Sequence, residues 1–151
     1  MAVNKILGTD QVVQIGILVH DIEKTAKAYS EFLGVEPRFA ETDAYDQAQT
    51  EYKGEPSQAR ARLAFFSVGP SLDIELIQPD EHPSTWRHDL DQKGEGVHHI
   101  AFTIKGMEEK VTLLTQNGMP LLQKGKYTGG EYAYMDANED LKLVLELLEN
   151  Y

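Results

Sequence analysis

Two kinds of hydrophobic pattern follow one another twice along the chain. Residues 12–37 (VVQIGILVHDIEKTAKAYSEFLGVEP) start with an alternating hydrophobic run, which is typical of a strand, and continue with hydrophobic residues at helical spacing. Residues 97–120 (VHHIAFTIKGMEEKVTLLTQNGMP) show the same order. Asp21 is expected to cap the start of the first helix, and Gly34 and Gly118 to end the two helices. The helical positions are Ile22, Ala26, Tyr29, Phe32 and Leu33 in the first copy, and Met107, Val111 and Leu114 in the second.

The ends of the two copies also match. Residues 71–79 (SLDIELIQP) align with residues 142–150 (KLVLELLEN), and both segments have the composition of strands. Further strands are expected at residues 59–69 and 130–137, and short ones near residues 35–39 and 121–123. Each half is therefore predicted to be a β-α-β-β-β module, in line with an internal repeat.

These matches predict one domain over residues 1–151, with module one at about residues 11–79 and module two at about residues 96–150. The connection, residues 80–95, should hold one short helix around residues 84–90. Residues 41–58 (ETDAYDQAQTEYKGEPSQ) are polar and predict a long loop, which could be either a lid or a plain connection. In a lid, Tyr45, Tyr52 and Lys53 could contact a substrate.

Composition narrows the classes of function. A formal net charge of -11 argues against nucleic acid as a partner, because such binding needs a basic face. The chain has no cysteine, which excludes disulfides and thiolate metal ligands and is compatible with the cytoplasm. No hydrophobic run approaches the roughly 20 residues that span a bilayer, and the first residues do not resemble a secretion signal, so no membrane partner is expected.

Four polar residues occupy matched positions in the two copies. Gln14 aligns with His99 on the first strands, and Glu75 aligns with Glu146 on the last strands. If the copies are related by pseudo-symmetry, all four side chains face one concave surface. A carboxylate in the middle of such a hydrophobic strand is costly unless it is paired or binds a metal. One imidazole, two carboxylates and one amide suit zinc, nickel, cobalt, manganese or ferrous iron.

Each of these residues also has an ordinary explanation when it is taken alone. A glutamate in an alternating strand usually faces solvent, and a strand histidine is usually hydrogen-bonded in the core. The neighbouring His98 should point to the opposite face of its strand and is read as structural or surface-exposed. His20, His82 and His88 are expected to be solvated.

The motifs QIGILVHDIEKTAKAYSEFLG, IELIQP, GEGVHHIAF and VLELLE together resemble the vicinal-oxygen-chelate (glyoxalase / bleomycin resistance / dioxygenase) superfamily. The resemblance covers about residues 11–149. It implies an α+β fold in which two β-α-β-β-β modules form a curved mixed sheet around a metal-binding cup. It also implies one divalent metal (zinc, nickel, cobalt or manganese) held by Gln14, Glu75, His99 and Glu146, and a homodimer. Gln14 stands where the family usually has histidine, although one branch of glyoxalase I has glutamine there.

Within the family, the pattern is most similar to glyoxalase I and methylmalonyl-CoA epimerase. The implied function is a metal-dependent isomerase, epimerase or lyase that moves a proton next to a carbonyl through an enolate, with Glu146 as the catalytic base and Glu75 as the alternative. The substrate would be a small molecule with a carbonyl oxygen, a thiohemiacetal or an acyl-CoA thioester. Cations that could hold its anionic tail are Lys124, Lys126 and Arg87.

Departures from both patterns leave the substrate open. ARLAFFSVG lacks the acid that the epimerase has on its third strand, and MDANED replaces an HPKS-like segment. Leu18 and Glu95 stand at or close to positions where glyoxalase I places arginines. One alternative is a metal-free binding or resistance protein, with a groove lined by Tyr132, Tyr134, Phe65 and Phe66. The other is an extradiol dioxygenase, which favours two histidines and one carboxylate.

Overall fold

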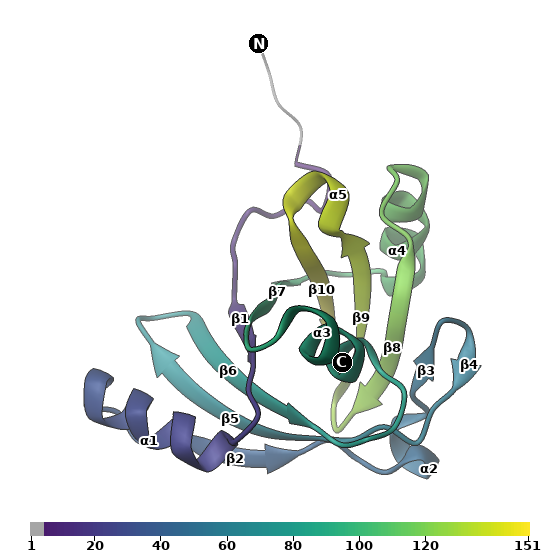
Figure 1. Ribbon diagram of the computed structural model, residues 1–151. Helices are drawn as coiled ribbons and strands as arrows, with labels where there is room; N and C mark the ends of the chain where they lie inside the picture. The colour runs from purple at the N-terminus through teal and green to yellow at the C-terminus, as the bar shows by residue number, and fades with distance from the viewer. Residues whose placement is uncertain (1–4) are drawn as a thin grey trace.

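The computed structural model describes residues 5–151, which form a single ten-stranded mixed sheet with five helices (Figure 1). The strand order is β2-β5-β6-β1-β7-β10-β9-β8-β3-β4. In chain order the elements are β1 (Gln14–Leu18), α1 (Ile22–Leu33), β2 (Arg38–Glu41), α2 (Tyr45–Ala48), β3 (Glu51–Tyr52), β4 (Glu55–Pro56), β5 (Ala61–Val68), β6 (Leu72–Pro79), α3 (Thr85–Lys93), β7 (Gly96–Thr103), α4 (Met107–Gln116), β8 (Leu121–Tyr127), β9 (Gly130–Ala137), α5 (Asn138–Leu141) and β10 (Leu143–Asn150).

The two halves of the sheet are related by the pairing of their first strands. β1 runs antiparallel to β7, and Ile15 lies opposite Ile100, the residue with which it aligns in the repeat. On either side, β6 is parallel to β1 and β10 is parallel to β7. Antiparallel strands β5 and β2, or β9 and β8, then continue each half. The predicted α+β fold with two modules in one curved mixed sheet is therefore confirmed.

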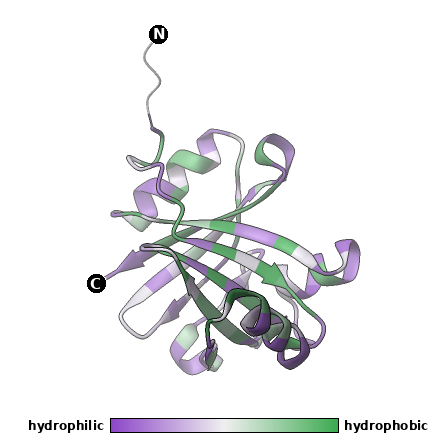
Figure 2. Ribbon diagram, turned by 90° about the vertical axis from the view of Figure 1, so that its left-hand side faces the viewer, coloured by the Kyte–Doolittle hydropathy of each residue, from purple (hydrophilic) through white to green (hydrophobic). Residues whose placement is uncertain are grey.

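Helices cover the convex face of each half and one part of the concave face. α1 packs Ile22 and Ala26 against the buried side chains of Phe66 and Leu76, and α4 covers the second half in the same way. α3 lies inside the curve of the sheet, where Trp86 and Leu90 join a core with residues of β1, β6, β9 and β10. Strand residues alternate between hydrophobic and hydrophilic, as Figure 2 shows, because the two faces meet different surroundings.

Local signals define the first helix, with one exception. The Asp21 side chain accepts a hydrogen bond from the Lys24 amide, and Gly34 ends the helix with a φ of 69°, both as predicted. Phe32 was expected on the buried face, but its side chain is 87% exposed. Its neighbour Leu33 takes the place in the core, since two adjacent helical residues cannot both face the sheet.

Residues 41–58 do not form the predicted loop. They contain α2 and the β3–β4 hairpin, which extends the sheet beyond β8 by pairing Glu51 with Lys124 and Tyr52 with Gln123. A segment of module one thus completes the edge of module two. Among the described residues, no helix is long and hydrophobic enough to cross a membrane.

Candidate metal centre

The four matched residues lie on the four central strands of the sheet. Gln14 is on β1, Glu75 on β6, His99 on β7 and Glu146 on β10. Two rows of paired residues carry them, namely Gln14, Ala101 and Glu146 in one row, and Glu75, Gly16 and His99 in the other. Each long side chain thus has a glycine or alanine beside it, which leaves room above the sheet for the four to meet.

The polar ends of the four side chains converge. The Nε2 atom of His99 lies 2.8 Å from the amide oxygen of Gln14, 3.1 Å from Oε1 of Glu146 and 3.6 Å from Oε1 of Glu75. His99 is fully buried, and the other three residues are 5 to 9% exposed. The structure therefore brings together all four residues that the repeat singled out, within one chain. Their role as metal ligands remains a prediction.

The Gln14 amide is fully hydrogen-bonded in only one of its two orientations. Its oxygen is turned towards the Glu146 and Glu75 carboxylates, at 2.7 and 3.3 Å from their Oε1 atoms, so that acceptor faces acceptor. With the amide reversed, its nitrogen would donate to both carboxylates and to His99. The reversed orientation is therefore the one that satisfies the Gln14 side chain.

Burial sets the charge of the cluster. Burial, followed by repulsion from Glu146, raises the pKa of Glu75 well above its ordinary value, and burial raises that of Glu146 to about 8. Burial also lowers the pKa of His99 to about 3, so its ring is neutral. No lysine or arginine forms an ion pair with either carboxylate among the described residues. Two buried acids without a cationic partner fit a divalent ion.

The spacing of the two carboxylates sets a condition on binding. The Oε1 atoms of Glu75 and Glu146 both lie within 3.6 Å of His99 Nε2, but these two oxygens are more than 4.8 Å from each other. The two carboxylate groups are therefore further apart than the roughly 4.4 Å that opposite oxygens on one ion span. They would have to draw together slightly for both to bind the same ion.

His98 does not point away from this cluster, contrary to the prediction. β7 contains a bulge, because Gly16 pairs with His99 while the next residue, Ile17, pairs with Val97. His98 is the extra residue, and a bulge interrupts the alternation of side chains between the two faces. Both histidines are buried, and their Nδ1 atoms lie 2.8 Å apart.

Tyr134 closes the cluster on the side of α3. Its hydroxyl accepts a hydrogen bond from Nε1 of Trp86 at 3.0 Å, and a hydrogen bond from this tyrosine to Glu146 works against the rise in the pKa of that acid. Tyr134 is also opposite Glu146 in the β9–β10 pair, so the sheet itself holds the two side chains together.

The cations expected to hold an anionic tail lie elsewhere. Arg87 pairs with Asp91 on the outer side of α3, and Lys124 pairs with Glu51 at the sheet edge. Sequence reasoning missed Arg38, whose guanidinium lies 4.4 Å from the centre of the Phe65 ring. Arg38 pairs with Phe65, and Phe65 pairs with Glu75, so the three residues form one row across β2, β5 and β6. No described carboxylate forms an ion pair with Arg38, and its charge lowers the pKa of Glu75. No signal in the sequence shows its direction, because the face that its side chain takes depends on the pairing of β2 with β5.

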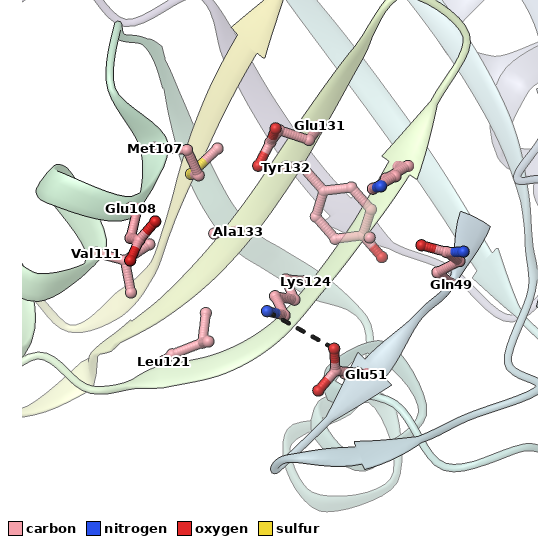
Figure 3. Close-up of a pocket in the computed structure, with 12 residues that line it drawn as sticks. Gln49, Glu51, Met107, Glu108, Val111, Leu121, Lys124, Glu131, Tyr132 and Ala133 are labelled. Carbon is pink, nitrogen blue, oxygen red and sulfur yellow. Dashed lines mark ion pairs between the residues drawn. The ribbon is translucent and has the colours of Figure 1, made fainter. Parts of the chain in front are cut away.

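The aromatic residues proposed for a groove do not line a common one. Phe66 is buried under α1 next to Tyr29, on the face opposite Phe65, and Tyr134 belongs to the cluster above. Tyr132 lines a cavity of about 570 Å³ between α4, β8, β9 and the residues before β3 (Figure 3). None of the four clustered residues lines this cavity.

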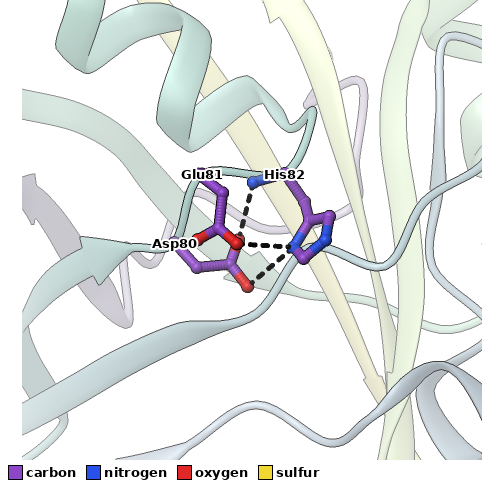
Figure 4. A group of neighbouring side chains, drawn as sticks. All are labelled: Asp80, Glu81 and His82. Atoms are coloured by element: carbon purple, nitrogen blue, oxygen red, sulfur yellow. Dashed lines mark hydrogen bonds and ion pairs between the residues drawn. The ribbon is translucent and has the colours of Figure 1, made fainter.

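A second group of ligand-type side chains lies just after β6. His82 Nδ1 is 3.2 Å from Asp80 Oδ2 and 3.9 Å from Glu81 Oε1 (Figure 4). His82 was predicted to be solvated, but it lies against these two carboxylates. His20 and His88 are exposed, as predicted. Asp80 also accepts hydrogen bonds from the backbone amides of Arg60 and His82. Hydrogen bonding within a turn therefore accounts for this group.

Comparisons with known proteins agree with this architecture. The sequence model of the Glyoxalase/Bleomycin resistance protein/Dioxygenase superfamily matches residues 13–135. A curated relative, the uncharacterized protein YqjC of Bacillus subtilis, is 28% identical over 138 residues, which is 89% of each chain.

Solved structures share the fold. Methylmalonyl-CoA epimerase from Mycobacterium tuberculosis has a TM-score of 0.70 and 21% identity, over all of this chain and 93% of its own. A Streptomyces coelicolor methylmalonyl-CoA epimerase in complex with 2-nitronate-propionyl-CoA has a TM-score of 0.66 and 22% identity, over 93% of this chain and 94% of its own. The hypothetical protein BH1468 from Bacillus halodurans has a TM-score of 0.67 and 23% identity, with the same coverage.

Proposed function

The chain belongs to the Glyoxalase/Bleomycin resistance protein/Dioxygenase superfamily, and we propose that it is a metal-dependent enzyme that moves a proton at a carbon next to a carbonyl group. The observation that carries this proposal is the buried meeting of two carboxylates, an imidazole and an amide around His99 Nε2. A protein that only needed to fold would gain nothing from placing two acids there.

Gln14, Glu75, His99 and Glu146 would hold one divalent ion such as zinc, nickel, cobalt or manganese. A bound ion supplies a Lewis acid that polarises a carbonyl oxygen and stabilises the negative charge that develops on it. With one histidine among the four residues, the set does not favour the two-histidine iron chemistry of extradiol dioxygenases.

Glu146 is the proposed base. Its carboxylate lies 3.1 Å from His99 Nε2, and it is held by Tyr134 on one side of the cluster. A buried carboxylate takes up a proton more readily than an exposed one, so Glu146 can accept the proton from carbon and return it. Glu75 occupies the equivalent place in the other half and is the alternative.

The proposed substrate is a small molecule with a carbonyl oxygen, either an acyl-CoA thioester or a thiohemiacetal. The solved epimerases that share the fold are named for methylmalonyl-CoA, which makes acyl-CoA thioesters the first class to test. Arg38 lies at the edge of the concave face and forms no ion pair with the residues that the structure describes, so it is the proposed contact for an anionic group of the substrate. We also propose a cytoplasmic homodimer. A second chain need not complete the site, because one chain holds all four ligands.

Metal content tests the proposal first. Purified protein should bind close to one equivalent of Zn²⁺, Ni²⁺, Co²⁺ or Mn²⁺ per chain by elemental analysis after dialysis. His99→Ala should lose that ion, while His88→Ala, which removes an exposed histidine of α3, should keep it. Failure of the wild-type protein to bind any of these ions would contradict the proposal and favour a metal-free binding protein.

Proton transfer is tested separately. With the metal bound, wild-type protein should exchange the α-proton of methylmalonyl-CoA, or of the thiohemiacetal of methylglyoxal and glutathione, with deuterium from the solvent, as followed by NMR. Glu146→Gln should lower that exchange by about 10²- to 10⁴-fold. A Glu146→Gln variant that retains the metal and exchanges at the wild-type rate would remove Glu146 from the role of base.

A further inference from the structure

His98 and His99 form a buried chain that leads from the cluster to α3. The two Nδ1 atoms lie 2.8 Å apart, and Nε2 of His98 lies 2.9 Å from the hydroxyl of Thr85 and 3.6 Å from Oδ2 of Asp89. Thr85 and Asp89 are both buried residues of α3. The side chains of His98, Thr85 and Asp89 do not reach the space where Gln14, Glu75 and Glu146 meet. Another role is therefore needed to explain these three residues.

The direction of the hydrogen bonds in this chain follows from its two ends. The 2.8 Å contact between the two Nδ1 atoms requires one of them to carry a proton and the other to accept it. At one end the reversed Gln14 amide donates to Nε2 of His99 at 2.8 Å, so His99 carries its proton on Nδ1. At the other end Nε2 of His98 faces the Thr85 hydroxyl and the Asp89 carboxylate, which can accept its proton. The Nδ1 atom of His98 is then bare and can only accept a hydrogen bond from the Nδ1–H of His99.

This direction leaves the Nε2 atom of His99 bare, with its lone pair turned towards Gln14, Glu75 and Glu146. A bare nitrogen is what a metal ligand requires, and it is also what the reversed Gln14 amide needs as an acceptor at 2.8 Å. We propose that His98 is a positioning residue that fixes His99 as the Nδ1–H tautomer, so that α3 prepares His99 to bind a cation. This inference rests on the proposed metal site for its use, although the tautomer can be measured without a metal.

The β7 bulge is the structural basis of this arrangement. Without it, His98 would face the convex side of the sheet, and the Nδ1 atom of His99 would have no partner. The extra residue thus lets one strand supply both a ligand and the group that orients it. Ligand histidines in metalloproteins are commonly oriented in this way by a second hydrogen bond.

Imidazole ¹⁵N NMR on metal-free protein tests the tautomer directly. His99 should carry its proton on Nδ1 and His98 on Nε2, and the opposite assignment would overturn the proposal. In His98→Leu, His99 should change to the Nε2–H tautomer, because Nε2–H can donate to Glu146 and Nδ1 has lost its partner. His98→Gln keeps a side-chain acceptor and should preserve the Nδ1–H form. His88→Gln is the control for removal of a histidine outside the chain.

Metal titration provides the second measurement, with Zn²⁺ and Ni²⁺ as the probes. His98→Leu should weaken binding by about 10- to 100-fold relative to wild type, while His98→Gln should recover most of the affinity. Equal affinities in wild type and a folded His98→Leu variant would overturn the proposed positioning role. A wild-type protein that binds neither ion contradicts the proposed function instead, and the NMR result then decides the tautomer alone.

Discussion

Gly16 lies directly opposite His99 in the β1–β7 pair, and the imidazole ring of His99 occupies the space of the side chain that Gly16 lacks. A Cβ atom on Gly16 would come within 2.6 Å of His99 Nε2 and would overlap two further ring atoms. In the segment QIGI (residues 14–17), this glycine is therefore needed for the site rather than for a turn. Its backbone φ is ordinary, so the reason for glycine here is space.

Gly16→Ala should displace His99 and weaken metal binding by at least about tenfold, with a loss of about 1–3 kcal/mol in the free energy of unfolding from overpacking. Metal titration and urea unfolding measure the two effects. Ala101→Gly, at the equivalent position of the second half, is the matched control and should cost at most about 1 kcal/mol without moving the ring. Unchanged metal affinity in Gly16→Ala would show that His99 has room to move.

Metal-free protein should be less stable at pH 8.5 than at pH 6. The pKa of Glu146 is raised from 4.5 to about 8 in the folded state, so the folded protein holds this proton more tightly than the unfolded chain. That stability is complete below pH 4.5 and is lost as the pH rises to 8. The Tm in EDTA should fall between pH 6.5 and 8.5, and added Zn²⁺ should reverse the fall.

The buried His99 changes stability with pH in the opposite direction. The pKa of His99 is lowered from 6.5 to about 3, so its contribution is complete above pH 6.5 and is lost as the pH falls towards 3. Between pH 4.5 and 6.5 the two effects oppose each other, and above pH 6.5 only the carboxylates act. Glu75→Gln/Glu146→Gln protein should therefore lose the fall in Tm above pH 6.5. Persistence of the fall in that variant would assign it to other groups.

Arg38→Gln should reduce selectivity for an anionic acyl group. Binding of malonyl-CoA relative to acetyl-CoA should fall by about two- to fivefold, the range expected for an exposed ion pair. Arg62→Gln is the control, because Arg62 is on the neighbouring strand but pairs with Glu23 of α1. Competition binding measures the ratio, and an Arg38→Gln ratio equal to that of wild type would exclude a contact between Arg38 and the carboxylate.

Backbone amides of the β3–β4 hairpin should exchange slowly with solvent. The Lys53 amide donates to the Leu122 carbonyl at 2.8 Å and the Ser57 amide donates to the Thr50 carbonyl at 2.9 Å. The Lys53 amide should therefore exchange at least about tenfold more slowly than that of Gly54 at the hairpin turn. Hydrogen exchange followed by NMR checks this, and equal rates would indicate that the segment opens as a lid does.

The internal repeat carried most of what the sequence could predict. Aligning Gln14 with His99 and Glu75 with Glu146 requires no knowledge of contacts, and the antiparallel pairing of β1 with β7 turns that alignment into proximity. The core strands and the two long helices were predictable because their hydrophobic periods are regular.

Long-range and irregular features were not predictable in this way. The β3–β4 hairpin has polar strands of two residues each, and its pairing with β8 depends on how the two modules fit together. The β7 bulge gives no hydrophobic signal, because His98 and His99 are both polar and strict alternation assigns them to opposite faces. Arg38 was overlooked because the face that its side chain takes depends on the pairing of β2 with β5, which the sequence does not reveal.

Joining both modules in a single polypeptide has a consequence for stereochemistry. In a symmetric pair of identical subunits, positions related by the dyad must carry the same residue. Here the pseudo-dyad beside Ile15 and Ile100 relates glutamine to histidine and glycine to alanine. The two sides of the site are therefore unlike, with a neutral amide on one side and an imidazole supported by α3 on the other. A planar reaction intermediate bound in it would present its two faces to unlike surroundings, which allows the protein to distinguish one mirror-image product from the other.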